Sequence, residues 1–457
     1  MKLTVIGGGG VRSMFLAKSL AQSVGSLNIS EIVFMDDNEK KLNIYGAMAR
    51  QVAKRIDPSV KFILTTDAVE AVRDADYIIT TIRPGEDTKR VDDERIALSH
   101  QVLGQETTGA AGFSFAMRSI PALVKYCELI RKYSSANVKV FNFTNPAGVV
   151  SQTLRDMGYD FTFGICDAPT TMLRSFASLY NVDPDAVTGD CFGLNHLSFF
   201  NSIYLDGRNI LPELIENDRL YTETEMRFFD KELTRSIGHM LNEYLYYFFY
   251  REQAVENILK AGVTRGEMIR EVNIHMTEEL SHMDIENDFD NCVKVFEKWY
   301  GKREDAYMAN ETGVANTKAP FKFDLNEEDE GGYAGVALKY IEMEQTKKPA
   351  EMIMCVPNNG AIPGLYDDDV VEVTCTISTD GYVPHKIENP ADIPMEIIRR
   401  VKIYERLASL AIRTHSKKAA IDCLMLHPLV NSYSLAKALV EEYLESNKDY
   451  IKGWTEA

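Results

Sequence analysis

A thiol and a carboxylate stand side by side where an apolar, β-prone run ends, in the segment GICDAP. Cys166 is followed there by Asp167, and His196 occurs further along in GLNHLSFF. Taken alone, a cysteine of this kind is more often a small buried residue than a ligand. Together, a thiolate and an imidazole are donors that favour a divalent transition metal. Because two protein ligands leave coordination positions open, the pair predicts a metal that bound substrate completes and that polarises a hydroxyl or carbonyl group.

A run of four glycines follows the first apolar segment, in VIGGGGVRSMFL. Such a turn lets a pyrophosphate approach the backbone, and the helix after it supplies amide donors and the positive end of its dipole. The second apolar run ends in Asp36, about where a carboxylate meets the ribose hydroxyls, and Asp37 is an alternative. An acid at this place favours NAD over NADP, because it repels a 2′-phosphate. The predicted cofactor-binding residues are Gly7, Gly8, Gly9, Gly10 and Asp36.

Apolar runs rich in Val, Ile and Phe alternate with amphipathic helical segments through the first part of the chain. This alternation is typical of parallel strands that helices cover on both faces. We therefore predict an α/β fold, with a Rossmann-like doubly wound N-terminal domain over residues 1–165 and a mixed α/β C-terminal domain over 166–457. The strands expected in the first domain are 2–7, 31–37, 61–66, 75–82 and 138–145.

The composition excludes several classes of protein. A formal net charge of −18 over 457 residues argues against binding to nucleic acid, although arginines gathered at one place still bind an anionic metabolite. We find no apolar stretch of about 18 residues and no signal peptide, so we expect no membrane partner. The seven cysteines lack a CxxC pair, which favours free thiols in a reducing compartment and predicts a cytoplasmic protein.

Several short segments, taken in order along the chain, resemble the motifs of a known enzyme family. In order along the chain they are the glycine turn, IRPGEDTKRVDDE, GQETTGAAGF, FNFTNPAG, GICDAP, FGLNHLSF, EYLYYFF, VTRGE and NNGAIPGL. In this order they resemble glycoside hydrolase family 4, whose members are the NAD-dependent exceptions among glycosidases. The resemblance covers essentially the whole chain. It implies NAD and a divalent metal, usually Mn²⁺, as cofactors, an architecture like that of lactate and malate dehydrogenases, and a homodimer or homotetramer.

The residue after the metal-binding cysteine divides this family. Members that act on 6-phospho-β-glucosides tend to carry Asn there, α-galactosidase-type members His, and 6-phospho-α-glucosidases Asp. With Asp167, the chain resembles the 6-phospho-α-glucosidases most. The resemblance implies a phosphorylated disaccharide such as maltose 6′-phosphate as substrate, a metal held by Cys166 and His196 at the C2 and C3 oxygens of the sugar, and Asp167 as the acid that protonates the glycosidic oxygen.

The mechanism that the resemblance implies uses the cofactor catalytically. NAD⁺ takes hydride from C3, a base removes the C2 proton, the leaving group departs, water adds to C1, and the same NADH reduces the C3 ketone. The base of the family is a tyrosine, and its position in LNEYLYYFFY indicates Tyr244. A phenol with an ordinary pKa of about 10 is a poor base, so we expect the metal or Arg265 to lower this pKa. Most other rings of this cluster are expected to be core.

The resemblance extends to residues that would hold the substrate. Glu106 in GQETTG would act at the active site by orienting a metal-bound water, although a loop carboxylate also commonly caps a helix. Asn145 follows a predicted strand at the carboxyl edge of the sheet, where ligands bind, and would hydrogen-bond to sugar hydroxyls. Arginines bind phosphate through a bidentate fork, and surface salt bridges are the competing interpretation. The candidates for the 6-phosphate are Arg83, Arg90 and Arg265.

One segment departs from the family pattern. Where members commonly show Arg-x-Gly-Gly, this chain has Arg83, Pro84, Gly85 and Glu86. An acid at this position weakens the case for phosphate contacts in the same loop.

Four other functions stay open at this point. They are an α-galactosidase or a 6-phospho-β-glucosidase of the same family, an NAD-dependent 2-hydroxyacid dehydrogenase, in which Cys166 would be incidental, and a non-enzymatic NAD-binding sensor.

Overall fold

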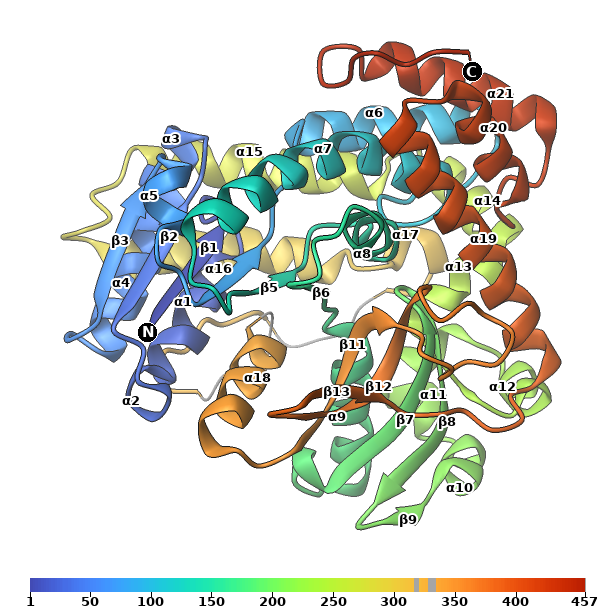
Figure 1. Cartoon of the computed structure of the whole chain (residues 1–457), viewed down its shortest axis with the longest axis horizontal. Helices are drawn as coiled ribbons and strands as arrows, with labels where there is room; N and C mark the ends of the chain where they lie inside the picture. The colour runs from blue at the N-terminus through green and yellow to red at the C-terminus, as the bar shows by residue number, and fades with distance from the viewer. Residues whose placement is uncertain (316–319, 328–333, 457) are drawn as a thin grey trace.

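The computed structural model describes residues 1–315, 320–327 and 334–456. Within them the central sheet has the strand order β13-β12-β11-β6-β5-β4-β1-β2-β3, and β1 to β6 are parallel. This is the order of doubly wound dinucleotide-binding folds, and all five predicted strands are present (Figure 1). The parallel strands are β1 (Lys2–Ile6), β2 (Glu31–Met35), β3 (Lys61–Thr65), β4 (Tyr77–Thr80), β5 (Lys139–Asn142) and β6 (Thr162–Gly164).

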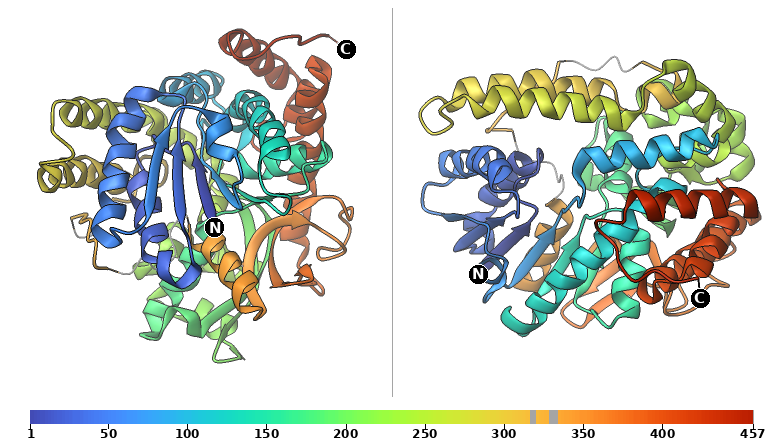
Figure 2. Two further views of the ribbon diagram at one scale, coloured as in Figure 1. Left: turned by 60° about the vertical axis from the view of Figure 1, so that its left-hand side comes forward. Right: turned by 90° about the horizontal axis from the view of Figure 1, so that it is seen from above.

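Helices cover both faces of the parallel strands (Figure 2). Successive strand residues point to opposite faces, so Ile32 and Phe34 of β2 pack in one apolar cluster with helices α1 and α4, whereas Val33 and Met35 pack in another with α5 and α7. The double burial explains the near-continuous apolar runs. The longer helices of this part are α1 (Ser13–Gln22), α4 (Ala47–Ile56), α5 (Ala68–Val72), α6 (Glu86–Ser99), α7 (Gly109–Tyr133), α8 (Ala147–Asp156) and α9 (Ala168–Tyr180).

The sheet does not stop at the predicted domain boundary. Strand β11 (Ala350–Pro357) pairs antiparallel with β6, placing Cys355 opposite Gly164, and β12 (Val370–Ser378) and β13 (Gly381–Pro384) continue the sheet. A second sheet contains β7 (Val187–Leu194), β8 (Leu197–Leu205), β9 (Arg208–Asn209) and β10 (Met240–Leu241). The Cys191 amide donates to the Thr374 hydroxyl at 2.9 Å and so joins β7 to β12. The division at residue 165 therefore remains a proposal, with a sheet shared across it.

Helices make up most of the remaining chain. After β9 follow α10 (Leu211–Glu216), α11 (Leu220–Glu223), α12 (Lys231–Ile237), α13 (Tyr246–Phe249), α14 (Arg251–Ala261), α15 (Arg265–Ser281), α16 (Phe289–Asp305) and α17 (Ala309–Thr312). The pair α15 and α16 forms the long yellow layer seen from above in Figure 2. The last four helices are α18 (Gly335–Thr346), α19 (Asp392–Thr414), α20 (Lys417–Leu426) and α21 (Tyr433–Ser446).

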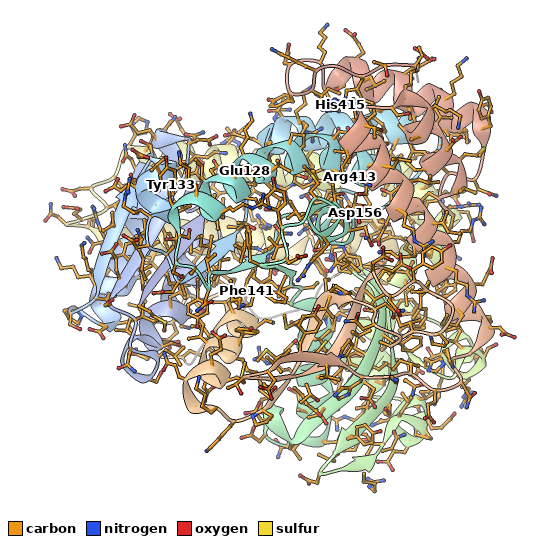
Figure 3. All side chains as sticks on the ribbon, viewed as in Figure 1. Glu128, Tyr133, Phe141, Asp156, Arg413 and His415 are labelled. Carbon is orange, nitrogen blue, oxygen red and sulfur yellow. The ribbon has the colours of Figure 1, made fainter. Side chains whose placement is uncertain are left out.

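Helix α19 packs directly on α8, the helix that follows β5. A Cβ atom on Gly148 would lie only 2.1 Å from Glu405 Oε1, so glycine permits this close approach. Asp156 Oδ2 accepts a hydrogen bond of 2.5 Å from Ser409 and lies 3.4 Å from Arg413 Nη2 (Figure 3). Gly148 lies in the first turn of α8 and Asp156 at its end, so contacts with α19 hold both ends of α8 and with them the loop after β5.

All seven cysteines are free, buried thiols, as the sequence predicts. Across the described residues, no helix has the length and apolar character needed to cross a membrane.

Candidate active site

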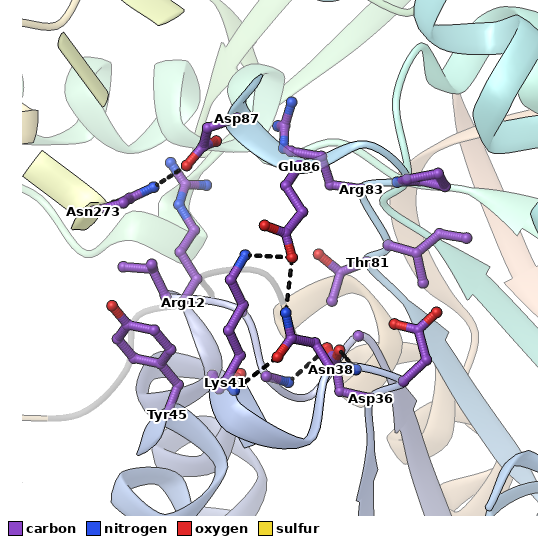
Figure 4. A pocket seen from close by; sticks show the side chains of 18 of the residues that line it. Arg12, Asp36, Asn38, Lys41, Tyr45, Thr81, Arg83, Glu86, Asp87 and Asn273 are labelled. Carbon is purple, nitrogen blue, oxygen red and sulfur yellow. Dashed lines mark hydrogen bonds and ion pairs between the residues drawn. The ribbon is translucent and has the colours of Figure 1, made fainter. Parts of the chain in front are cut away.

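Two cavities adjoin at the carboxyl ends of the parallel strands. The larger, of about 970 Å³, extends over the glycine turn and the end of β2 (Figure 4). The smaller, of about 190 Å³, contains the residues singled out above for catalysis, metal and substrate. The two share Arg12, Thr81, Arg83, Arg90, Ile269 and Arg303. A nucleotide in the first cavity would therefore reach the second, and four of the six shared residues are arginines.

The glycine turn has the geometry of a dinucleotide site. Gly7 has φ +101°, and a Cβ atom on it would lie 2.4 Å from the Thr81 carbonyl oxygen. Gly7, Gly9 and Gly10 line the large cavity, but Gly8 does not. Gly8 faces β2 instead, where a Cβ atom would lie 2.6 Å from Phe34 Cβ. Gly8 therefore allows close packing of the turn on the sheet, and its contact with the cofactor remains a prediction.

Asp36 lines the same cavity and supports the turn. Its Oδ2 accepts the Gly9 N–H at 2.9 Å, and its Oδ1 accepts the Asn38 N–H at 2.9 Å (Figure 4). Burial raises the pKa of Asp36, and these two N–H donors oppose the rise. Each carboxylate oxygen keeps a lone pair, so Asp36 can brace the turn and still accept a ribose hydroxyl.

The predicted metal ligands meet in the smaller cavity. Cys166 follows β6, and His196 lies in the two-residue turn between β7 and β8; they are 8% and 6% exposed. His196 has φ +62°, an unusual conformation for a residue with a side chain. Its Nδ1 is buried without a hydrogen-bond partner among the described residues. An orphaned imidazole nitrogen beside a thiol fits a soft divalent metal. No group of three or more His, Cys, Asp or Glu suited to a metal occurs in the described chain, so other ligands must come from outside the protein.

A buried carboxylate lies behind this pair. Glu372 on β12 accepts a hydrogen bond of 3.0 Å from Asn195 Nδ2, and its other oxygen is buried without a partner among the described residues. Burial raises the pKa of Glu372 to about 7. Burial and Glu372 together raise the pKa of the Cys166 thiol well above its usual value. Burial lowers the pKa of His196 to about 4. Without metal, the thiol is therefore protonated and the imidazole neutral near pH 7.

These protonation states predict that metal binding releases protons. At pH 7 at least one proton should leave per Mn²⁺ bound, because the Cys166 thiol must ionise whereas His196 is already neutral. Affinity should rise about tenfold per pH unit between pH 5.5 and 7.5, with no further loss from His196 until the pH approaches 4. Calorimetry in two buffers of different ionisation enthalpy counts the protons. An affinity that does not change with pH would argue against ligation by the thiol.

Asp167 and Tyr244 line the same cavity as Cys166 and His196. Asp167 precedes α9 and lines the cavity next to Cys166. The Tyr244 ring lies 4.0 Å from the His196 ring, and its hydroxyl accepts from Tyr307 at 3.2 Å. Burial and Glu243 raise the pKa of Tyr244 well above its usual value. Arg265 does not provide the expected lowering, because its Nη1 donates to the Arg303 carbonyl at 2.9 Å and its guanidinium lies over the Tyr307 ring. A bound metal would therefore have to lower the pKa of Tyr244.

Glu106 is held by two of the arginines predicted to bind phosphate. It accepts from Arg83 Nη1 and lies 3.2 Å from Arg90 Nη1. Burial alone would raise the pKa of Glu106, but Arg83 and Arg90 hold it well below its usual range. Arg90 also donates to Glu94 at 2.8 Å. Both guanidinium groups are thus paired with carboxylates in this structure, which weakens the prediction that Arg83 and Arg90 bind the sugar phosphate.

The VTRGE segment explains how Arg265 is placed. Thr264 caps α15 in a reciprocal capping box with Glu267. Gly266 lets the helix approach α6, since its N–H donates to Glu94 Oε2 at 2.8 Å and a Cβ atom would lie 2.6 Å from that oxygen. Arg265, the first residue of the helix, is thereby held at the wall of the smaller cavity.

Arg303 is a cavity residue that the sequence reasoning missed. It comes from α16 and lines both cavities, and its guanidinium lies over the Tyr300 ring, 5.7 Å from the ring centroid. Its Nε is buried and unpaired. Burial and the neighbouring Arg12 lower the pKa of Arg303 to about 10. Arg12 and Arg265 both disfavour the charge of Arg303, and Glu304 offsets only part of this effect, so the site is suited to an anion. No motif surrounds Arg303, and only the packing of α16 brings it here.

Asn145, the last predicted residue, follows β5 and lines the smaller cavity, at the carboxyl edge where it was expected. The structure thus brings all nine predicted catalytic, metal and substrate residues into one cavity: Asp167, Tyr244, Glu106, Cys166, His196, Asn145, Arg83, Arg90 and Arg265.

Comparison with known proteins finds one family over nearly the whole chain. The profile of family 4 glycosyl hydrolases matches residues 2–182, and that of the family 4 glycosyl hydrolase C-terminal domain matches residues 191–430. The 6-phospho-beta-glucosidase BglT of Thermotoga maritima is 30% identical over 99% of this chain and 100% of its own length. Its structure with manganese, NAD⁺ and glucose-6-phosphate has a TM-score of 0.80, with 28% identity and the same coverage.

A 6-phospho-alpha-glucosidase from gut microorganisms, solved with NAD and glucose-6-phosphate, has a TM-score of 0.83 at 25% identity and covers 98% of both chains. Lactate dehydrogenase of Eimeria maxima, with a TM-score of 0.50 at 13% identity over 90% of this chain and 96% of its own, is similar in fold alone. The expected dehydrogenase-like architecture is confirmed.

Proposed function

The chain belongs to glycosyl hydrolase family 4, and we propose that it hydrolyses 6-phospho-α-glucosides, with maltose 6′-phosphate-type disaccharides as substrates. The observation that carries this proposal is the cavity in which a thiol, an orphaned imidazole and the Asp167 carboxylate lie directly beside a nucleotide cleft. Family members solved with NAD, manganese and glucose-6-phosphate support the cofactors and the phosphorylated sugar.

NAD⁺ and the metal would supply the redox and Lewis-acid chemistry that side chains cannot provide. NAD⁺ would provide a reversible hydride acceptor at C3, and a metal held by Cys166 and His196 would provide a Lewis acid at the C2 and C3 oxygens. The protein's own residues would do the proton chemistry. Tyr244, whose ring lies 4.0 Å from that of His196, would take the C2 proton, because a nearby divalent cation favours the phenolate over the phenol. Asn145 would orient the sugar hydroxyls from the end of β5.

Asp167 would complete the reaction by protonating the glycosidic oxygen. It follows Cys166 directly, so a metal bound to the thiol fixes the sugar close to this carboxyl group. The Asp at this position is the feature that favours the α-linked substrate, since the β-specific members that the sequence resembles tend to carry Asn. The relatives include enzymes named for both linkages, so this residue, and not overall identity, supports the choice.

Glu106 would act as a fixed anion. Paired with Arg83 and Arg90, it would remain ionised and orient a water near His196. The 6-phosphate would then be bound by Arg265 and Arg303, because neither guanidinium forms an ion pair within the described chain. This proposal replaces two of the three arginines expected from the sequence.

Replacement of Arg303 tests whether this residue binds the 6-phosphate and whether the cavity binds a phosphorylated sugar. In Arg303→Met, glucose 6-phosphate should bind about 10- to 100-fold more weakly, because a charge-assisted hydrogen bond is worth roughly 1.5–3 kcal/mol. The affinity for NAD⁺ should change less than about threefold. Lys302→Met is the matched control, since Lys302 lies over the Trp299 ring and lines neither cavity. Calorimetric titration measures both ligands. Weaker NAD⁺ binding with unchanged sugar-phosphate binding would place Arg303 at the cofactor instead.

A further inference from the structure

An acidic side chain crosses the ribose end of the nucleotide cleft. Glu86 Oε1 accepts a hydrogen bond of 2.9 Å from Asn38 Nδ2 and lies 3.0 Å from Lys41 Nζ. Figure 4 shows these contacts converging on one carboxylate oxygen. Glu86 comes from the loop after β4, whereas Asn38 and Lys41 come from the segment after β2. All three line the large cavity. We refer to Glu86, Asn38 and Lys41 as the ribose bridge.

The backbone is shaped to make this bridge. Glu86 has φ +54°, and Gly85 before it has φ +84°. A residue with a side chain adopts the left-handed region at a cost of order 1 kcal/mol or more, and keeps it where the surroundings hold it. Here this conformation starts α6 and directs the Glu86 side chain toward Lys41.

Lys41 is a cation whose charge acts on the Asp36 carboxylate. It lies on α3 (Glu39–Lys41), directly after the turn that carries Asp36, and its charge partly offsets the effect of burial on the pKa of Asp36. A cation at this place is what accommodates the 2′-phosphate of NADP in dinucleotide-binding folds. Lys41 alone would therefore make the cleft tolerant of NADP, despite Asp36. Its pairing with Glu86 offsets part of that positive charge and adds a second acid to the same wall of the cavity.

We propose that Glu86 is a cofactor-selecting residue, which excludes a 2′-phosphate by neutralising Lys41 and by adding its own negative charge beside Asp36. This inference rests on the proposed function only in requiring that the cleft binds a nicotinamide dinucleotide. It explains why an acid stands in the loop that the sequence pattern otherwise assigns to phosphate contact. Asn38 contributes by holding the carboxylate at the mouth of the cleft.

Equilibrium binding of NAD⁺ and NADP⁺ to the full chain, without sugar or metal, tests the proposal. In Glu86→Gln, the affinity for NADP⁺ should rise about tenfold, because Lys41 becomes free for one charge-assisted contact to the phosphate and a like charge is lost. The affinity for NAD⁺ should stay within about threefold. Adding Lys41→Gln to Glu86→Gln should remove the gain. Glu39→Gln is the matched control, since Glu39 lines the same cavity without joining the bridge.

The outcomes separate the inference from the function on which it rests. Failure of the wild-type chain to bind NAD⁺ would overturn the proposed function. Tight NAD⁺ binding, with no gain for NADP⁺ in Glu86→Gln, would overturn the role of Glu86 alone. A gain that persists in the double variant, or that Glu39→Gln reproduces, would show that general negative charge and not the ribose bridge selects the cofactor.

Discussion

Replacing Cys166 with alanine should lower kcat/KM by roughly 10³-fold or more, because loss of the thiolate removes a Lewis acid worth several kcal/mol of charge stabilisation. Only two protein ligands are proposed for the metal, so the loss of one leaves His196 alone, and a single imidazole does not retain Mn²⁺ at ordinary concentrations. The cysteine is buried at the end of β6, where alanine fits without strain. We therefore expect a folded protein that binds NAD⁺ normally.

Manganese binding gives this prediction a measurement that is independent of turnover. The fraction of free Mn²⁺, followed by electron paramagnetic resonance, should show binding in the wild-type protein with NAD⁺ and sugar phosphate and a loss of affinity of at least about 10²-fold in Cys166→Ala. Cys423→Ala is the control, because that thiol is also buried but lies on α20 and lines neither cavity. Unchanged Mn²⁺ affinity in Cys166→Ala would refute the metal site.

Replacing Asp167 with asparagine should have the second large effect, and the effect should depend on the leaving group. A sugar alkoxide must be protonated as it departs, so hydrolysis of an α-linked disaccharide phosphate should fall about 10³-fold, within the range for loss of a general acid. A 4-nitrophenolate departs without a proton, so the matching aryl glucoside phosphate should lose less than about tenfold.

The same variant carries its own control. Asparagine keeps the size of the side chain next to Cys166, so the affinities for Mn²⁺ and for glucose 6-phosphate should remain within about threefold of the wild-type values. A loss of equal size with the alkyl and the aryl leaving group would contradict a role in proton donation, and would instead indicate that Asp167 positions the metal or the sugar.

Much of the fold follows from local sequence patterns. The strands β1, β2, β4 and β5 are short, largely buried runs, and β3 is a partly buried edge strand, so their Val, Ile and Phe residues are recognisable without knowledge of the tertiary structure. The side chains after these strands gather at one edge because parallel strands end together, which is why Gly7, Asp36, Asn145 and Cys166 could be placed from their positions alone. The continuation of the sheet through β11 could not be predicted, since antiparallel pairing across 190 residues leaves no local signal.

The sequence does not determine which of two chemically similar partners a given residue contacts. An arginine near a phosphate site and an arginine paired with a glutamate look the same in sequence, and Arg83 and Arg90 are committed to Glu106. Gly8 likewise occurs in a phosphate-binding turn but serves the packing against Phe34. Arg303 belongs to a helix whose apolar spacing predicts only burial, and its place in the cavity is set by how α16 packs on the rest of the chain.

The proposed reaction is cleavage of an α-linked 6-phosphoglucoside, with proton donation from Asp167 during a redox-neutral cycle. The most direct measurement compares glucose 6-phosphate release from maltose 6′-phosphate and cellobiose 6′-phosphate, with NAD⁺ and Mn²⁺ present and NADH absorbance recorded throughout. We expect hydrolysis of the α-linked compound that requires both cofactors, much slower hydrolysis of the β-linked compound, and no net NADH. Faster cleavage of cellobiose 6′-phosphate, or NADH accumulating in proportion to product, would contradict the account.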